Sequence, residues 1–129
     1  TQALAIAAAA DGNTNVLAIT TASDGYQGQI QQVLRDVNGN WGGWVTMPVP
    51  PGVPLTQHSD VAIARTATQA SVMFLDAENR AYLQLRENPN LAPSWQTQVP
   101  ARLITTQGRT VSISQGSPSL VLVTRADPQ

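Results

Sequence analysis

Apolar residues stand at every second position in many short segments along the chain. Because side chains alternate between the two faces of a β-strand, this period predicts strands with one buried face. No segment keeps the apolar spacing of an amphipathic helix over three turns, and glycine or proline interrupts most candidate windows. The chain is therefore predicted to be all-β. The predicted strands cover residues 4–8, 15–21, 29–37, 41–47, 60–64, 71–75, 80–86, 94–99, 109–114 and 120–124.

Turn-forming residues separate these strands. Asp24-Gly25 and Asn38-Gly39 are dipeptides typical of tight β-turns. Pro48, Pro50 and Pro51 follow the fourth predicted strand, and they end it because proline has no N–H group for a sheet ladder. Short strands with turn signals at regular intervals predict a sandwich, a barrel or a propeller.

The order of strands and turns repeats after about 50 residues. Trp95 follows Trp44 at a distance of 51 residues, and an arginine followed by an acid precedes each tryptophan, at Arg35-Asp36 and at Arg86-Glu87. Repeats of this length are typical of arrays, solenoids and propellers. Repetition of a four-strand unit favours the propeller. The predicted units cover residues 3–50 and 59–100, with a partial unit at 109–125.

Composition narrows the possible functions. The 129 residues, of which 42% are hydrophobic, suffice for one domain with a core. Absence of cysteine excludes disulfides, thiolate metal sites and thiol nucleophiles, and it leaves the cellular compartment open. A net charge of -1, with 12% charged residues, argues against nucleic-acid binding. No apolar run is long enough to span a bilayer, so no membrane insertion is expected.

Patterns that would indicate catalysis or metal binding are missing. His58 is the only histidine, and it stands directly beside Ser59 and Asp60, whereas the members of a catalytic triad approach from separate segments. The eight acidic residues fall mostly in turns rather than in a pattern that predicts paired carboxylates. Asp11-Gly12-Asn13 falls short of a calcium loop, and phosphate-binding glycine loops are absent. We therefore expect no enzymatic activity, no metal and no cofactor.

The segments NVLAITTASDG, QIQQVLRD and GNWGGWVTMP resemble one blade of the bacterial and fungal β-propeller lectins. SVMFLDAEN, AYLQLREN and PSWQTQVP resemble the next blade, although Ala77-Glu78 replaces Asp-Gly and no aromatic residue stands where Trp41 does. In those lectins each blade carries an outer strand that ends in a tryptophan-containing turn. The resemblance implies repeated four-stranded antiparallel blades, about two and a half in this chain. It also implies glycan sites between blades, and a ring completed as a homo-oligomer or by the rest of a larger propeller.

A sugar site needs an aromatic face for the C–H side of the ring and planar polar groups for the hydroxyls. Tryptophan with arginine and an acid provides this set twice, and aromatic residues in glycine-rich turns add to it. The predicted ligand-binding residues are Trp41, Trp44, Arg35, Asp36, Tyr26, Trp95, Arg86 and Glu87. The competing interpretation is structural, with Trp44 and Trp95 packed between sheets and each arginine in an exposed ion pair.

The sequence thus predicts a non-catalytic carbohydrate-binding lectin and leaves two alternatives open. The chain could be a propeller segment that serves as a scaffold for protein–protein interaction, or a non-catalytic part of a larger enzyme or toxin. Trp41, Arg35 and Tyr26 distinguish the lectin from the scaffold. If these side chains are grouped and face solvent they favour the lectin, whereas burial favours the scaffold.

Overall fold

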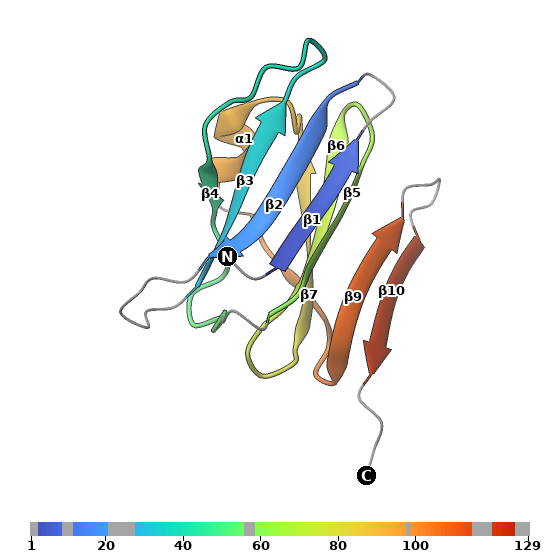
Figure 1. The fold of residues 1–129 in the computed structure, drawn as a ribbon. Coiled ribbons are helices and arrows are strands. Elements are labelled where there is room, and N and C mark those ends of the chain that lie inside the picture. The colour runs from blue at the N-terminus through green and yellow to red at the C-terminus, as the bar shows by residue number, and fades with distance from the viewer. Residues whose placement is uncertain are drawn as a thin grey trace.

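The computed structural model describes residues 3–8, 12–20, 28–55, 59–97, 99–114 and 120–125. Strands dominate this part of the chain, with one short helix (Figure 1). The elements are, in order, β1 (Ala3–Ala8), β2 (Thr14–Thr20), β3 (Gln29–Arg35), β4 (Val45–Met47), β5 (Val61–Arg65), β6 (Gln69–Leu75), β7 (Ala81–Glu87), α1 (Ala92–Gln96), β8 (Arg102–Thr105), β9 (Gly108–Ser114) and β10 (Leu120–Arg125). The predicted Asp24-Gly25 turn, Tyr26 and His58 lie outside the described residues.

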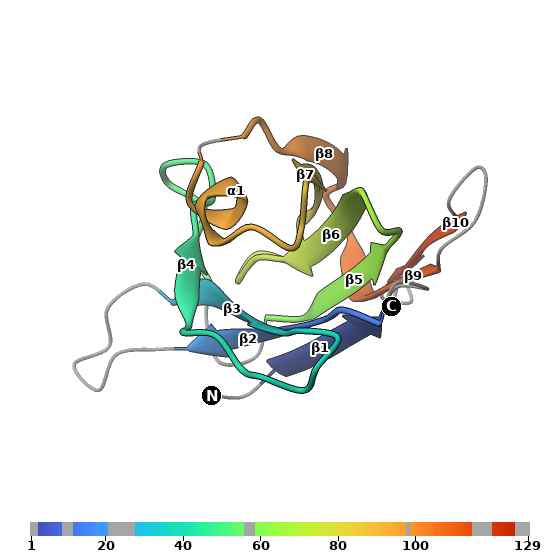
Figure 2. The same cartoon turned by 90° about the horizontal axis from the view of Figure 1, so that it is seen from above.

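The strands form antiparallel sheets in which each strand pairs with its neighbour in the sequence. β1-β2-β3-β4 make the first four-stranded sheet, β5-β6-β7-β8 make the second, and β9 and β10 pair as a hairpin. Seen from above, the second sheet lies over the first, and the hairpin lies to one side, with β9 next to β5 (Figure 2). The β-rich antiparallel class predicted from the sequence is confirmed. The described strands do not close into a ring.

One predicted strand is wrong. Residues 94–99 were expected to form the last strand of the second unit, but the chain makes α1 there. A proline within the first two helical positions explains this, because its fixed φ suits the first turn of a helix. The fourth strand of the second sheet is instead β8, so this sheet extends to Thr105 rather than ending at residue 100.

The fourth strand of the first sheet is shorter than predicted. The expected strand at residues 41–47 is reduced to β4, and Trp41 makes only an isolated bridge with Arg35. Gly42 and Gly43 separate the bridge from β4. Glycine weakens a strand because it loses more backbone freedom on ordering than other residues and has no side chain to pack.

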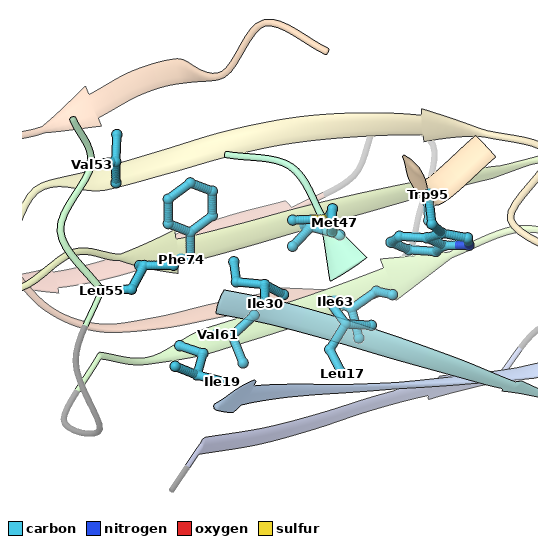
Figure 3. Packing of buried hydrophobic residues seen from close by; sticks show 12 residues of the cluster. Leu17, Ile19, Ile30, Met47, Val53, Leu55, Val61, Ile63, Phe74 and Trp95 are labelled. Atoms are coloured by element: carbon cyan, nitrogen blue, oxygen red, sulfur yellow. The ribbon is translucent and has the colours of Figure 1, made fainter. Parts of the chain in front are cut away.

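The main hydrophobic core lies between the two four-stranded sheets (Figure 3). Leu17 of β2 and Phe74 of β6 are fully buried in it, and Trp95 of α1 packs into the same cluster. The alternation of apolar residues along β2, β5 and β6 directs one face of each strand into this space. The cluster contains Leu17, Ile19, Ile30, Met47, Val53, Leu55, Val61, Ile63, Ala70, Val72, Phe74 and Trp95.

β6 of the second sheet is buried on both faces along most of its length. Met73 and Leu75 of β6 form a separate cluster with Ala81 of β7 and Val111 of β9. The hairpin therefore covers the face of the second sheet that is turned away from the first sheet. Burial on both faces explains why the last four residues of β6 are all buried rather than alternately exposed.

Asp60 ties the second sheet to the hairpin. Its Oδ1 accepts a hydrogen bond from the N–H of Val61 at 3.0 Å, and its Oδ2 accepts one from the N–H of Val111 at 3.1 Å. One carboxylate thus holds the start of β5 against β9 through two main-chain donors. A carboxylate that accepts main-chain hydrogen bonds forms stronger bonds than a neutral acceptor does.

Candidate functional site

β3 ends in a five-residue turn whose shape is held by Asp36. Asp36 Oδ1 accepts hydrogen bonds from the N–H groups of Asn38 and Asn40, both at 2.9 Å. The N–H of Asp36 also donates to the carbonyl oxygen of Asn40 at 2.9 Å. Gly39 has φ +84, a left-handed conformation that is unfavourable for residues with a Cβ atom. The turn therefore places the residues after it in a defined position.

Arg35 and Trp41 lie opposite each other across the base of this turn. They form an isolated antiparallel bridge, and the N–H of Gly42 donates to the carbonyl oxygen of Leu34 at 2.9 Å. Side chains at opposed positions of an antiparallel pair project from the same face of the sheet. The predicted pairing of an arginine with a tryptophan is therefore present in space, although the partner is Trp41 rather than Trp44.

Three large apolar side chains near this turn face solvent. Val37 is 64% exposed, Trp41 59% and Trp44 53%. We call residues 35–44 the tryptophan turn. An exposed indole offers a flat apolar face together with one N–H donor. Trp41 and Arg35 are thus opposed to each other and exposed to solvent, whereas Tyr26, the third residue of the predicted group, lies outside the described residues.

The second predicted set is divided between core and surface. Trp95 is fully buried, and its Nε1 donates to the carbonyl oxygen of Pro89 at 3.0 Å. Arg86 is 1% exposed, and desolvation by burial lowers the pKa of its guanidinium. Glu87 is exposed. The Arg86 guanidinium donates to the main-chain carbonyl oxygens of Pro48, Ser94 and Thr97.

Arg86 and Glu87 of this second set line a pocket of about 410 Å³. Its lining residues are Leu85, Arg86, Glu87, Asn88, Ser94, Thr97 and Val99. The indole of Trp95 is buried in the core and does not line it. Two residues spaced as copies in the sequence, Trp44 and Trp95, therefore occupy different environments, one exposed and one enclosed.

The turn between β6 and β7 repeats the hydrogen bonds of the tryptophan turn. Asp76 Oδ1 accepts from the N–H groups of Glu78 at 2.8 Å and Arg80 at 3.0 Å. The N–H of Asp76 donates to the carbonyl oxygen of Arg80 at 3.0 Å, and Asn79 has φ 64. Sequence reasoning missed this match because the first turn follows the third strand of its sheet and the second follows the second strand. The signal was an aspartate followed three residues later by glycine or asparagine.

Sequence reasoning also missed a buried polar network between the two sheets. Arg65 of β5 is 2% exposed, and it donates to Asn15 Oδ1 at 2.6 Å and to Asn90 Oδ1 at 2.8 Å. Asn15 Nδ2 in turn donates to Gln32 Oε1 at 2.9 Å. The available signal was that Gln32 shares the apolar face of its predicted strand with Ile30. Asn15, Gln32 and Arg65 are buried, so this network links β2 and β3 of the first sheet to β5 of the second through hydrogen bonds.

Comparison with protein-family models, curated proteins and solved structures finds no match for this chain. Within the described ranges, no group of three or more histidine, cysteine or acidic residues is arranged to hold a metal ion. The one helix in that part of the chain has five residues, and no helix there could cross a membrane.

Proposed function

We propose that the chain is a non-catalytic carbohydrate-binding protein and that the tryptophan turn is its glycan site. The observation that carries this proposal is the exposure of two indoles, those of Trp41 and Trp44, directly after a turn whose backbone is held by Asp36. An ordered turn reduces the conformational entropy that is lost on binding, because less of the backbone has to become fixed when the ligand binds. Stacking of a sugar ring on an indole uses the apolar C–H side of the sugar.

Arg35 adds the polar half of such a site. Its side chain projects from the same face as Trp41, and Arg35 forms no ion pair with any described residue. A guanidinium presents several N–H donors in one plane, which suits the oxygen atoms of adjacent hydroxyl groups. A ligand stacked on Trp41 would therefore have hydrogen-bond donors within its reach at Arg35.

We also propose that the two sheets and the hairpin are successive blades of a β-propeller. The supporting feature is their stacking, since the second sheet packs against the first on one face and against the hairpin on the other. Copies of this chain, or the rest of a larger propeller, would complete the ring. A small open site binds weakly alone, and several equivalent sites in one assembly would raise the overall affinity.

A glycan array tests the binding proposal. The wild-type chain is expected to bind one or more glycans, and Trp41→Ala is expected to lose that binding with an unchanged far-UV circular dichroism spectrum. Leu103→Ala is the matched control, because Leu103 is 48% exposed and lies on β8 rather than in the tryptophan turn. Failure of the wild type to bind any glycan, or equal binding by Trp41→Ala, would refute the proposal.

Light scattering on the same sample tests the assembly. A defined oligomer whose mass is unchanged by Trp41→Ala would support a ring made from copies of the chain. A monomer would argue against self-association and would leave completion by other segments as the remaining form of the propeller proposal. Binding of a protein rather than a glycan at Trp41 would instead support the scaffold function.

A further inference from the structure

The tryptophan turn and the β6–β7 turn differ in the partner of the second carboxylate oxygen of their aspartates, Asp36 and Asp76. In the β6–β7 turn, Arg80 Nε donates to Asp76 Oδ2 at 2.7 Å, and Arg80 also lies 3.3 Å from Glu78. The side chain of Asp76 is completely buried under this contact. The turn therefore neutralises its own aspartate, and no part of that carboxylate remains open to a ligand.

The tryptophan turn has asparagine where the other turn has this arginine. Asp36 and Asp76 make the same main-chain hydrogen bonds through Oδ1, so Asn40 and Arg80 hold equivalent positions. Among the described residues, none donates a hydrogen bond to Asp36 Oδ2 or forms an ion pair with it. Asp36 is only partly buried. One oxygen of this carboxylate thus holds the turn while the other remains available.

We propose that Asp36 Oδ2 accepts a hydrogen bond from a hydroxyl group of the bound glycan, in the place that Arg80 takes against Asp76. This inference rests on the glycan-binding function proposed above. Residue 40 then decides the role of the turn: asparagine leaves the aspartate open to a ligand, and arginine closes it. Trp41 follows Asn40 directly, so the open oxygen and the indole belong to neighbouring positions of one turn.

The chemistry of this oxygen restricts the ligand. An ionised carboxylate only accepts hydrogen bonds, so the group that meets it must be a donor. Neutral glycans with free hydroxyl groups satisfy this requirement, whereas a glycan carboxylate at the same point would be repelled. A hydrogen bond to a charged group contributes enough that its loss lowers affinity roughly 10- to 100-fold.

Two variants test the proposal against an array of neutral and carboxylate-bearing glycans, followed by titration with the strongest neutral binder. Asn40→Arg is expected to form the ion pair seen at Asp76 and to lose roughly 10- to 100-fold in affinity. It should unfold at the same or a higher urea concentration than the wild type. Asp36→Asn keeps an oxygen for the main-chain hydrogen bonds and is expected to lose affinity to a similar extent.

A control in the other turn separates this effect from damage to the fold. Arg80→Asn makes the corresponding change in the other turn and should leave glycan affinity unchanged. If Asn40→Arg and Asp36→Asn bind normally while Trp41→Ala does not, this inference is wrong and the glycan-binding function stands. If the wild type binds no glycan, both are wrong.

Discussion

Trp44 and Trp95 are spaced as copies of one another, yet the structure predicts very different costs for removing them. Trp95 is fully buried among core side chains and donates a hydrogen bond to Pro89, whereas Trp44 is 53% exposed. Truncation of a buried tryptophan to alanine leaves a cavity and typically costs about 3–5 kcal/mol of unfolding free energy. Trp44→Ala is expected to cost no more than about 1 kcal/mol, because most of its surface contacts water already.

Trp95→Phe separates packing from hydrogen bonding. Phenylalanine fills part of the space, and the carbonyl oxygen of Pro89 keeps its hydrogen bond from Asn15 Nδ2 at 3.2 Å. No buried acceptor is left without a donor, so we expect a loss of about 1–3 kcal/mol, between those of the two alanine variants.

Urea denaturation followed by far-UV circular dichroism measures these differences. Tryptophan fluorescence is unsuitable, because each variant removes one of the three indoles that produce the signal. For a domain with about 5–15 kcal/mol of stability, Trp95→Ala should move the midpoint far below that of Trp44→Ala. Equal shifts for the two alanine variants would show that the tryptophans share one environment, and the reasoning from burial would be refuted.

Two further predictions concern the buried network around Arg65 and the titration of Tyr82. Arg65→Met should lower the free energy of unfolding by about 2–4 kcal/mol, because the side-chain oxygens of Asn15 and Asn90 each lose a hydrogen-bond donor. In the same urea assay, Arg102→Met should cause almost no change, because Arg102 is exposed. Similar losses for the two variants would contradict the role of the network. Burial raises the pKa of Tyr82 above its usual 10.0, so the contribution of the neutral phenol is complete below pH 10 and lost as pH rises through the raised value. Alkaline unfolding of Tyr82→Phe should therefore depend less steeply on pH than that of the wild type, and identical slopes would argue against this role.

Local patterns in the sequence were sufficient to predict most strands and turns. Alternating apolar residues located the strands within a few residues, since a strand must direct every second side chain into the core. Asparagine and glycine located a turn at residues 38–40, and the structure begins this turn two residues earlier, at Asp36. The glycine-rich turn also marked Trp41 as a candidate for binding rather than for packing, because such turns lie at the surface.

Similarity at a fixed spacing did not predict burial. Arg35 and Arg86 occupy matching positions in the sequence, but only Arg86 is enclosed, because α1 and the segment after it fold over β7 and supply carbonyl oxygens to its guanidinium. The helix itself was mistaken for a strand, since five residues are too few to show a helical period.

The sequence by itself therefore determined most of the strands and the residue types of the turns, which depend on neighbouring residues. Only the tertiary structure decided which tryptophan is enclosed, which arginine is desolvated, and which aspartate is paired with an arginine. Each of these depends on segments that are far apart in the chain or on a single residue opposite the group in question, as Arg80 is to Asp76. A local sequence pattern does not identify such partners, because burial and pairing arise only when the sheets pack.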